Sequence, residues 1–120
     1  MLMNDLYTFT PVEITPGRIS GKVRFDPSHA IFQGHFPGKP VVPGVCLVQA
    51  IEEVMGDHLG RDLGLSDAVN IKFLQMIDPK ENTEIILEID FVPEKNGFVK
   101  VDASYREKEI IFMKFRGSFH

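Results

Sequence analysis

The length, composition and charge of the chain set the first limits on what it is. Its 120 residues are 43% hydrophobic and 25% charged, which is typical of an ordinary globular protein with a single domain spanning residues 1–120. Thirteen basic against seventeen acidic residues give a net charge of −4, which argues against a nucleic-acid partner, and the single cysteine, Cys46, excludes an internal disulfide framework.

The first two predicted elements are strands at residues 6–14 and 18–26. They flank a Thr-Pro-Gly tripeptide at 15–17, a combination that favours a tight turn. In the second strand Ile19, Val23 and Phe25 alternate with polar residues, and this period of two places them on one face of a sheet.

A helix is predicted at residues 45–59. Apolar residues recur there at the helical spacing, namely Val45, Val48, Ile51, Met55 and Leu59. Pro43 suits the start of a helix and Gly60 suits its end. The width of the apolar stripe indicates that the helix is largely buried.

Four more strands are predicted after the helix, at residues 69–77, 83–92, 99–106 and 109–119. The clearest is 83–92, where Ile85, Leu87 and Ile89 share one face. The Asn96-Gly97 pair favours a tight hairpin between this strand and the next one, at 99–106. The expected architecture is α+β, a long curved antiparallel sheet of about six strands wrapped around one central helix.

No apolar run approaches the roughly 20 residues of a membrane-spanning helix. The first ten residues, MLMNDLYTFT, lack the basic flank and apolar core of a secretion signal. We therefore expect a cytoplasmic protein with no membrane partner.

Glycine and proline crowd into the segment that precedes the predicted helix. They fill six of the eleven positions of residues 34–44, GHFPGKPVVPG, and this density stiffens the backbone. The backbone N–H groups at Gly44 and Val45 begin the helix and have no intrahelical partner, so they would point from a rigid loop at a bound group. The segment is a candidate site.

This segment also carries a resemblance to a known family. Residues 32–45, FQGHFPGKPVVPGV, match every fixed position of the F-x-G-H-F-P-G-x-P-x-x-P-G-V signature of the β-hydroxyacyl-acyl-carrier-protein dehydratases. The chain thus resembles these enzymes of bacterial fatty acid synthesis, which have the hot-dog fold. The looser likeness extends over nearly the whole chain.

The resemblance implies an activity and a set of roles. Such enzymes dehydrate a (3R)-3-hydroxyacyl thioester on acyl carrier protein to the trans-2-enoyl thioester, without cofactor or metal, as dimers with active-site tunnels at the subunit interface. His35 matches the histidine that handles the α-proton. Gly44 and Val45 would polarise the thioester carbonyl, and an apolar tunnel would be lined by Phe32, Phe36 and Phe73.

These roles make chemical sense for elimination of water beside a thioester. The α-proton is weakly acidic and hydroxide is a poor leaving group, so the reaction needs a base near neutrality and a proton donor. An imidazole such as that of His35 suits the first task. Helix N–H groups at Gly44 stabilise the negative charge that develops on the carbonyl.

One position departs from the family pattern. Fourteen residues after His35, where the family has Glu or Asp on the helix of the partner subunit, this chain has Gln49, whose amide does not titrate. Glu53 lies one helical turn further, and residues four apart share a helix face. We hypothesise that Glu53 restores part of the acid function, against the alternative that it is a structural or solvated carboxylate.

Three functions remain open from the sequence. The first is a 3-hydroxyacyl-acyl-carrier-protein dehydratase acting through His35 and Gln49 or Glu53. The second is a non-catalytic acyl-binding or partner subunit that kept the tunnel and lost the acid, and the third is a hot-dog thioesterase. The dehydratase would be a homodimer, a heterodimer with a homologue that supplies the acid, or a higher oligomer.

Overall fold

The computed structural model describes residues 1–33 and 39–120. Its elements are six strands, one long helix and two short 3₁₀ turns at Ala30–Phe32 and Lys95–Gly97. The strands and the helix are β1 (Tyr7–Thr15), β2 (Arg18–Phe25), α1 (Gly44–Leu59), β3 (Leu65–Phe73), β4 (Ile85–Pro93), β5 (Val99–Glu107) and β6 (Ile110–Phe119).

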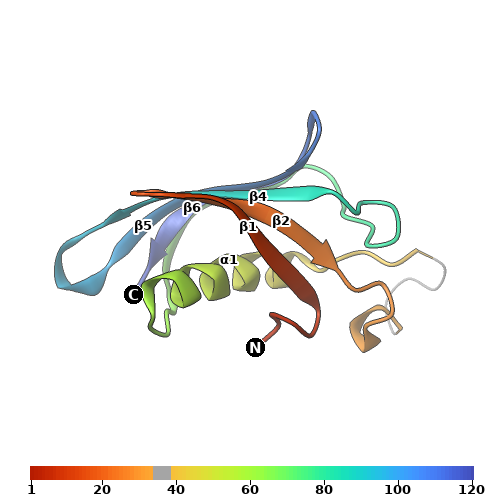
Figure 1. Cartoon of the computed structure of the whole chain (residues 1–120), viewed down its shortest axis with the longest axis horizontal. Coiled ribbons are helices and arrows are strands. Elements are labelled where there is room, and N and C mark those ends of the chain that lie inside the picture. The colour runs from red at the N-terminus through yellow and green to blue at the C-terminus, as the bar shows by residue number, and fades with distance from the viewer. Residues whose placement is uncertain (34–38) are drawn as a thin grey trace.

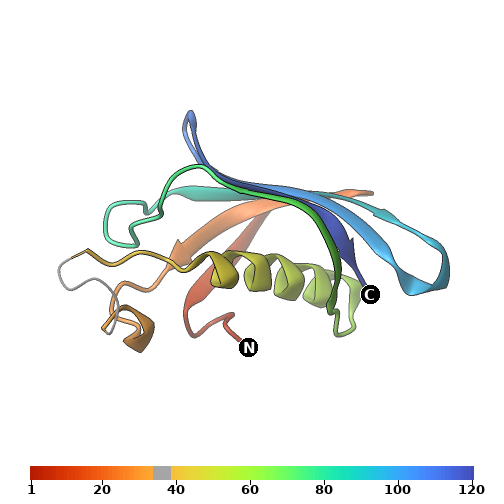
Figure 2. The ribbon, with the colours of Figure 1, turned by 180° about the vertical axis from the view of Figure 1, so that it is seen from behind.

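All six strands form one antiparallel sheet with the order β1-β2-β4-β5-β6-β3. The first and third strands of the chain therefore lie at the two edges. The sheet curves over α1, which runs along its concave side (Figure 1). Seen from behind, β3 descends past the C-terminal end of α1 (Figure 2). The predicted α+β hot-dog architecture is confirmed.

The core lies between the concave face of the sheet and α1. In β4 the side chains of Ile85, Leu87 and Ile89 are completely buried, whereas the intervening Glu88 and Asp90 face outward. The same alternation holds in β5. In β4 and β5 the period-two pattern of the sequence therefore predicted the buried face correctly, because each of these strands buries one side against the helix, whereas most residues of β1 and β3 are exposed.

Two tight turns depend on backbone conformations that few residues adopt. Gly17 joins β1 to β2 with φ +85°, and Asn96 and Gly97 join β4 to β5 with φ 63° and 82°. Positive φ is accessible to glycine and tolerated by asparagine. Both turns were predicted from these residues.

The helix α1 starts and ends as the sequence predicted. Pro43 is the N-cap, and Gly60 takes a left-handed conformation (φ 72°) while its N–H bonds to the Gly56 carbonyl. The buried Tyr105 hydroxyl donates a hydrogen bond of 2.6 Å to the Leu47 carbonyl, which fixes the helix against β5. Within the described residues no helix is long and apolar enough to cross a membrane.

The strand predicted at 69–77 was misplaced by four residues, since β3 runs from Leu65 to Phe73. Two bulges in its pairing with β6 interrupt the alternation at the start of the strand, so the sequence pattern is hidden there. At the other end, the N–H groups of Leu74 and Gln75 both bond to the Phe112 carbonyl and end the ladder. Ile77 is buried from the following loop rather than from a strand.

Candidate active site

The glycine- and proline-rich segment is described only in part. His35 and Phe36, predicted as the base and as a tunnel residue, lie outside the described residues. Where the chain resumes, the Val42 N–H donates to the Ile77 carbonyl at 3.0 Å, which ties the approach to α1 to the loop after β3. The segment that carries the signature therefore leads directly into the N-terminus of α1.

The start of α1 packs against the end of β3. A Cβ atom on Gly44 would lie 2.7 Å from the ring of Phe73, closer than side chains approach one another, so this contact requires glycine. Pro43 provides no side-chain cap, and the Cys46 N–H bonds to the Pro43 carbonyl. The predicted carbonyl-polarising residue and one predicted tunnel residue are thus brought together.

The two described phenylalanines of the predicted tunnel lie in different surroundings. Phe32 is 8% exposed and belongs to the hydrophobic core, whereas Phe73 is 58% exposed at the edge of the sheet. Val45 beside it is 73% exposed. An apolar surface therefore flanks the helix start, whereas Phe32 belongs to the core.

Gln49 and Glu53 meet one turn apart on α1, as their spacing predicted. The Gln49 amide nitrogen (Nε2) donates to one carboxylate oxygen of Glu53 (Oε2) at 2.9 Å. Both side chains are partly buried. Gln49, which occupies the family's acid position, is thus hydrogen-bonded directly to the carboxylate of Glu53.

The Glu53 carboxylate also accepts hydrogen bonds from the N-terminal segment of the chain. Its Oε2 accepts from the Leu2 N–H at 2.8 Å, in addition to Gln49. Its Oε1 accepts from the Met3 N–H at 2.8 Å and from the Tyr7 hydroxyl at 2.9 Å. Each oxygen therefore accepts two hydrogen bonds, an arrangement that strongly favours the ionised carboxylate.

The pKa values near this carboxylate follow from these contacts. Burial on its own would raise the pKa of Glu53, but the hydrogen bonds from Leu2, Gln49, Tyr7 and Met3 outweigh it, and the pKa is lowered. The neighbouring Glu52 has a raised pKa, because it is partly buried and lies beside the Glu53 charge. At neutral pH Glu53 is thus ionised, and it accepts hydrogen bonds from residues of its own chain.

A hollow of about 610 Å³ opens beside this cluster, on the side of α1 turned away from the sheet. Gln49, Glu52 and Glu53 line it together with Met1 from the N-terminal segment. In the part of the chain that the structure describes, the Gln49 side-chain oxygen accepts no hydrogen bond. The amide therefore presents an acceptor next to an open space.

Sequence reasoning did not identify the N-terminal residues as partners of Glu53. Leu2 and Met3 contribute backbone N–H groups, which any residue type has, and they are about fifty positions away in sequence. Tyr7 contributes a hydroxyl from the first residue of β1, where it is buried. A tyrosine that is buried and must satisfy its hydroxyl was the available signal.

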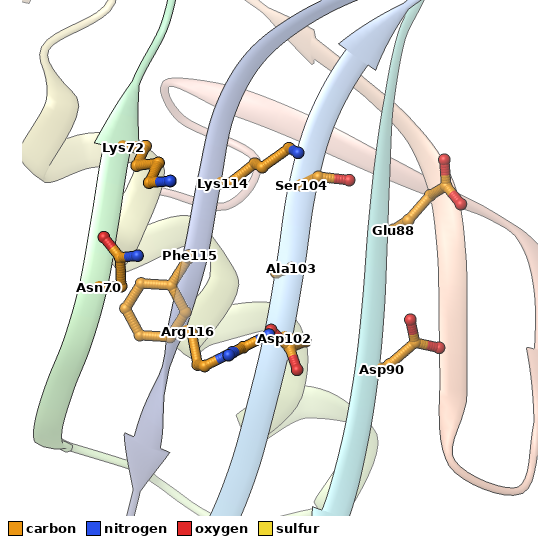
Figure 3. A pocket seen from close by; sticks show the side chains of 10 residues that line it. All are labelled: Asn70, Lys72, Glu88, Asp90, Asp102, Ala103, Ser104, Lys114, Phe115 and Arg116. Atoms are coloured by element: carbon orange, nitrogen blue, oxygen red, sulfur yellow. The ribbon is translucent and has the colours of Figure 1, made fainter.

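A second groove, of about 430 Å³, lies on the opposite, convex face of the sheet. Figure 3 shows Arg116 from β6 beside Asp102 from β5, with Lys72 of β3 and Lys114 of β6 further along the groove and Asp90 of β4 on its other side. Its lining is dominated by charged side chains, and ion pairs such as Arg116 with Asp102 cross it. A charged groove does not suit an acyl chain, and neither does the part of the α1 hollow that is lined by Glu52, Asp57, Arg61 and Asp62.

The apolar flank, as we call the exposed hydrophobic side chains around β3 and the start of α1, is the remaining feature of that side. Its members are between 45% and 75% exposed, namely Val45, Leu65, Val69, Phe73, Leu74 and Met76. A contiguous exposed group of this kind marks an interaction surface.

Comparison with known proteins gives a consistent result. Residues 12–112 match the ApeI-like family, described as ApeI dehydratase. A 3-hydroxyacyl-[acyl-carrier-protein] dehydratase FabZ from Clostridium acetobutylicum is 33% identical over 114 residues, covering 84% of this chain and 81% of the relative. FabZ from Enterococcus faecalis is 28% identical over 116 residues, with shares of 84% and 81%.

Among solved structures, the dehydratase heterocomplex ApeI:P from Xenorhabdus doucetiae is similar to this chain, with a TM-score of 0.79. The sequences are 20% identical, and the match covers 98% of each chain. A structure described as Cj0977 from Campylobacter jejuni gives a TM-score of 0.69 at 12% identity, over 98% of this chain and 85% of the other. At these identities the likeness concerns the fold.

Proposed function

The chain belongs to the ApeI-like dehydratase family, and on that premise we propose that it eliminates water from a (3R)-3-hydroxyacyl thioester on acyl carrier protein. The product is the trans-2-enoyl thioester. The observation that carries the proposal is the complete signature at residues 32–45, which leads into the start of α1, where Gly44 packs under Phe73.

The chemistry is assigned to few groups. His35 removes the proton from C2, and the N–H groups at Gly44 and Val45 stabilise the charge that develops on the thioester oxygen. The C3–O bond then breaks, the C2–C3 double bond forms, and the departing oxygen takes a proton to leave as water. Since the Gln49 amide is not an acid, the His35 imidazolium is the donor we propose for that proton.

Gln49 would hold the 3-hydroxyl during this step, and Glu53 supports it. The prediction that Glu53 is itself the acid remains open to test, although a carboxylate that accepts four hydrogen bonds at neutral pH has few means to donate a proton. The acyl chain would lie along the apolar flank, against Phe73. That Phe32 and Phe36 also line this tunnel stays a prediction.

We also propose that a second copy of this chain completes the site by covering the apolar flank. β3 is an edge strand, so one side of its backbone N–H and C=O groups is available for pairing. Val69 and Phe73 on that strand are more than half exposed, which is costly unless another surface covers them. The alternative partner is a homologue, and the related structure is described as a heterocomplex.

An assay on the purified protein tests the proposed reaction. We expect the protein to interconvert 3-hydroxyacyl- and trans-2-enoyl-acyl carrier protein, measured by mass spectrometry of the carrier. His35→Ala should lower kcat by about 10²–10⁴-fold, the usual contribution of a general base. The matched control is His58→Ala, because His58 lies in the last turn of α1 and packs edge-on against Phe91.

The other functions predict different results in the same assay. Acyl-carrier binding without turnover, with activity appearing in Gln49→Glu, would show a non-catalytic subunit. Release of the free carrier thiol would show a thioesterase. Activity that appears only after a homologue is added would show that the acid comes from a different chain.

A further inference from the structure

The hydrogen bond between Gln49 and Glu53 determines which end of the Gln49 amide faces the substrate. We propose that Glu53 is a positioning residue, which holds the NH₂ group of Gln49 toward itself and thereby presents the Gln49 carbonyl oxygen to the 3-hydroxyl of the substrate. This inference rests on the proposed function and assigns Glu53 a part in the reaction that differs from that of an acid.

The orientation follows from the chemistry of the two groups. An ionised carboxylate has no proton to donate, so the group within 2.9 Å of Glu53 Oε2 must be the NH₂ end of Gln49. The reversed amide would place an oxygen against the Glu53 carboxylate and would lose a charge-assisted hydrogen bond. The Gln49 carbonyl oxygen is therefore directed away from Glu53.

The Glu53 carboxylate cannot rotate easily to break its hydrogen bond with Gln49. Its Oε1 accepts from Met3 and Tyr7, and its Oε2 accepts from Leu2 as well as from Gln49. Two of these donors are the backbone N–H groups of Leu2 and Met3, in a segment anchored three residues later by the completely buried Leu6. Rotation of Glu53 would break bonds to three separate residues, so the N-terminal segment preorganises the amide of Gln49.

A fixed acceptor has a specific use in this reaction. A 3-hydroxyl group donates its proton to the Gln49 carbonyl and thereby turns an oxygen lone pair toward the group that will protonate it. Gln49 lines the hollow of about 610 Å³, so its carbonyl is accessible from outside the core. An amide free to flip would offer the NH₂ group half of the time and would hold the hydroxyl in the wrong sense.

A double-mutant cycle tests the inference. Glu53→Gln retains the size of the side chain but leaves the amide of Gln49 free to face it in either sense, so we expect kcat to fall about tenfold with KM nearly unchanged, the scale of one hydrogen bond. In a Gln49→Ala background the same Glu53→Gln change should have no further effect. An additional loss in that background would overturn the inference, because Glu53 would then act directly.

A matched control separates orientation from folding. Ile85→Val removes one methyl group from a completely buried residue of β4 and leaves all four hydrogen bonds to Glu53 in place. We expect this variant to be less stable than the wild type while kcat stays within twofold. A loss of kcat as large as that of Glu53→Gln would show that both act through stability, and would overturn the inference.

A readout that needs no turnover keeps this inference separate from the proposed reaction. In ¹⁵N-labelled protein the Gln49 side-chain NH₂ protons should exchange slowly with solvent and shift markedly in Glu53→Gln, but not in Ile85→Val. An unshifted signal would overturn the orientation whether or not the protein is active. A shifted signal in a protein without dehydratase activity would support the orientation and refute the proposed reaction.

Discussion

The two flanks of α1 differ in how their apolar surface is covered. On the β1 side, Leu6 and Tyr7 are at most 1% exposed, and the residues before them bond to Glu53. On the β3 side, Val69 and Phe73 are 64% and 58% exposed. The chain thus covers the start of its β1 side, although Val12 and Ile14 further along β1 are 65% and 55% exposed, and it leaves the β3 side exposed next to the start of α1.

We expect this difference to make stability and assembly depend on different sides of the helix, with Glu53 on the β1 side as the proposed link to catalysis. The β1 flank buries side chains and satisfies polar groups within the chain, so changes there should alter the free energy of unfolding. The β3 flank contributes little buried area within one chain, so changes there should alter assembly and catalysis. Four predictions test this separation.

The largest effect is expected on the β3 flank. Val69→Lys would place a charge in the proposed contact between two copies, so the dimer should dissociate and activity should fall about 10²-fold. Light scattering gives the mass of the particle, and the carrier assay gives the rate. Val92→Lys is the control, since Val92 is 60% exposed on β4, and it should retain the mass of the wild type. An unchanged mass in Val69→Lys would contradict the proposed contact.

The second largest effect is expected on the β1 flank. Leu6 is completely buried, so Leu6→Ala should lower the free energy of unfolding by about 2–5 kcal/mol through lost packing and the cavity that remains. Denaturant unfolding measures this value. Val12→Ala, at a position 65% exposed on the same edge of the sheet, should change it by less than about 0.5 kcal/mol. Equal effects at the two positions would refute the assignment of the core to this flank.

A smaller change is expected from one hydrogen bond of the same flank. Tyr7→Phe removes the hydroxyl that donates to Glu53 at 2.9 Å, and hydrogen bonds to charged groups contribute about 1.5–3 kcal/mol. Because the carboxylate retains other donors, we expect a loss near the lower limit of that range, about 1.5 kcal/mol. Thermal and denaturant unfolding should agree, and a variant as stable as the wild type would show that this bond has no net value.

The smallest effect is a dependence of stability on pH. The pKa of Glu53 is lower in the folded chain than in the unfolded one, because hydrogen bonds outweigh its partial burial. Its contribution is therefore present above the unfolded pKa of about 4.3 and is lost as the pH falls through the lower folded pKa. In Glu53→Gln the free energy of unfolding should therefore decrease less steeply as the pH falls, which denaturant unfolding at several pH values measures. A slope equal to that of the wild type would contradict this contribution of Glu53.

Much of the fold was predictable because local patterns determined it. The alternation of Ile85, Leu87 and Ile89 predicted the buried face of β4, and the glycines at 17, 60 and 97 marked turns and a helix end that require positive φ. The start of β3 was not predictable, because bulges around Asp67 and Val69 break the alternation. Sequence patterns describe periodic structure, whereas a bulge depends on the neighbouring strand.

The site was predictable to a smaller extent, for a similar reason. The spacing of Gln49 and Glu53 indicated that they meet, and they do. The partners that give Glu53 its environment are backbone groups of Leu2 and Met3, which carry no signature of their own. The exposure of Phe73, in contrast to the burial of Phe32, depends on the position of β3 at the edge of the sheet.

The contact between Gly44 and Phe73 has a consequence for attempts to alter the proposed acyl tunnel. A methyl group at position 44 would force the exposed Phe73 ring to turn aside, while a smaller residue at 73 would open a gap over the first turn of α1. A change at either position therefore alters the space above the helix start. Pairwise variation, with a larger side chain at 44 accompanied by a smaller one at 73, keeps the packed volume nearly constant while it shifts the surface of the proposed tunnel.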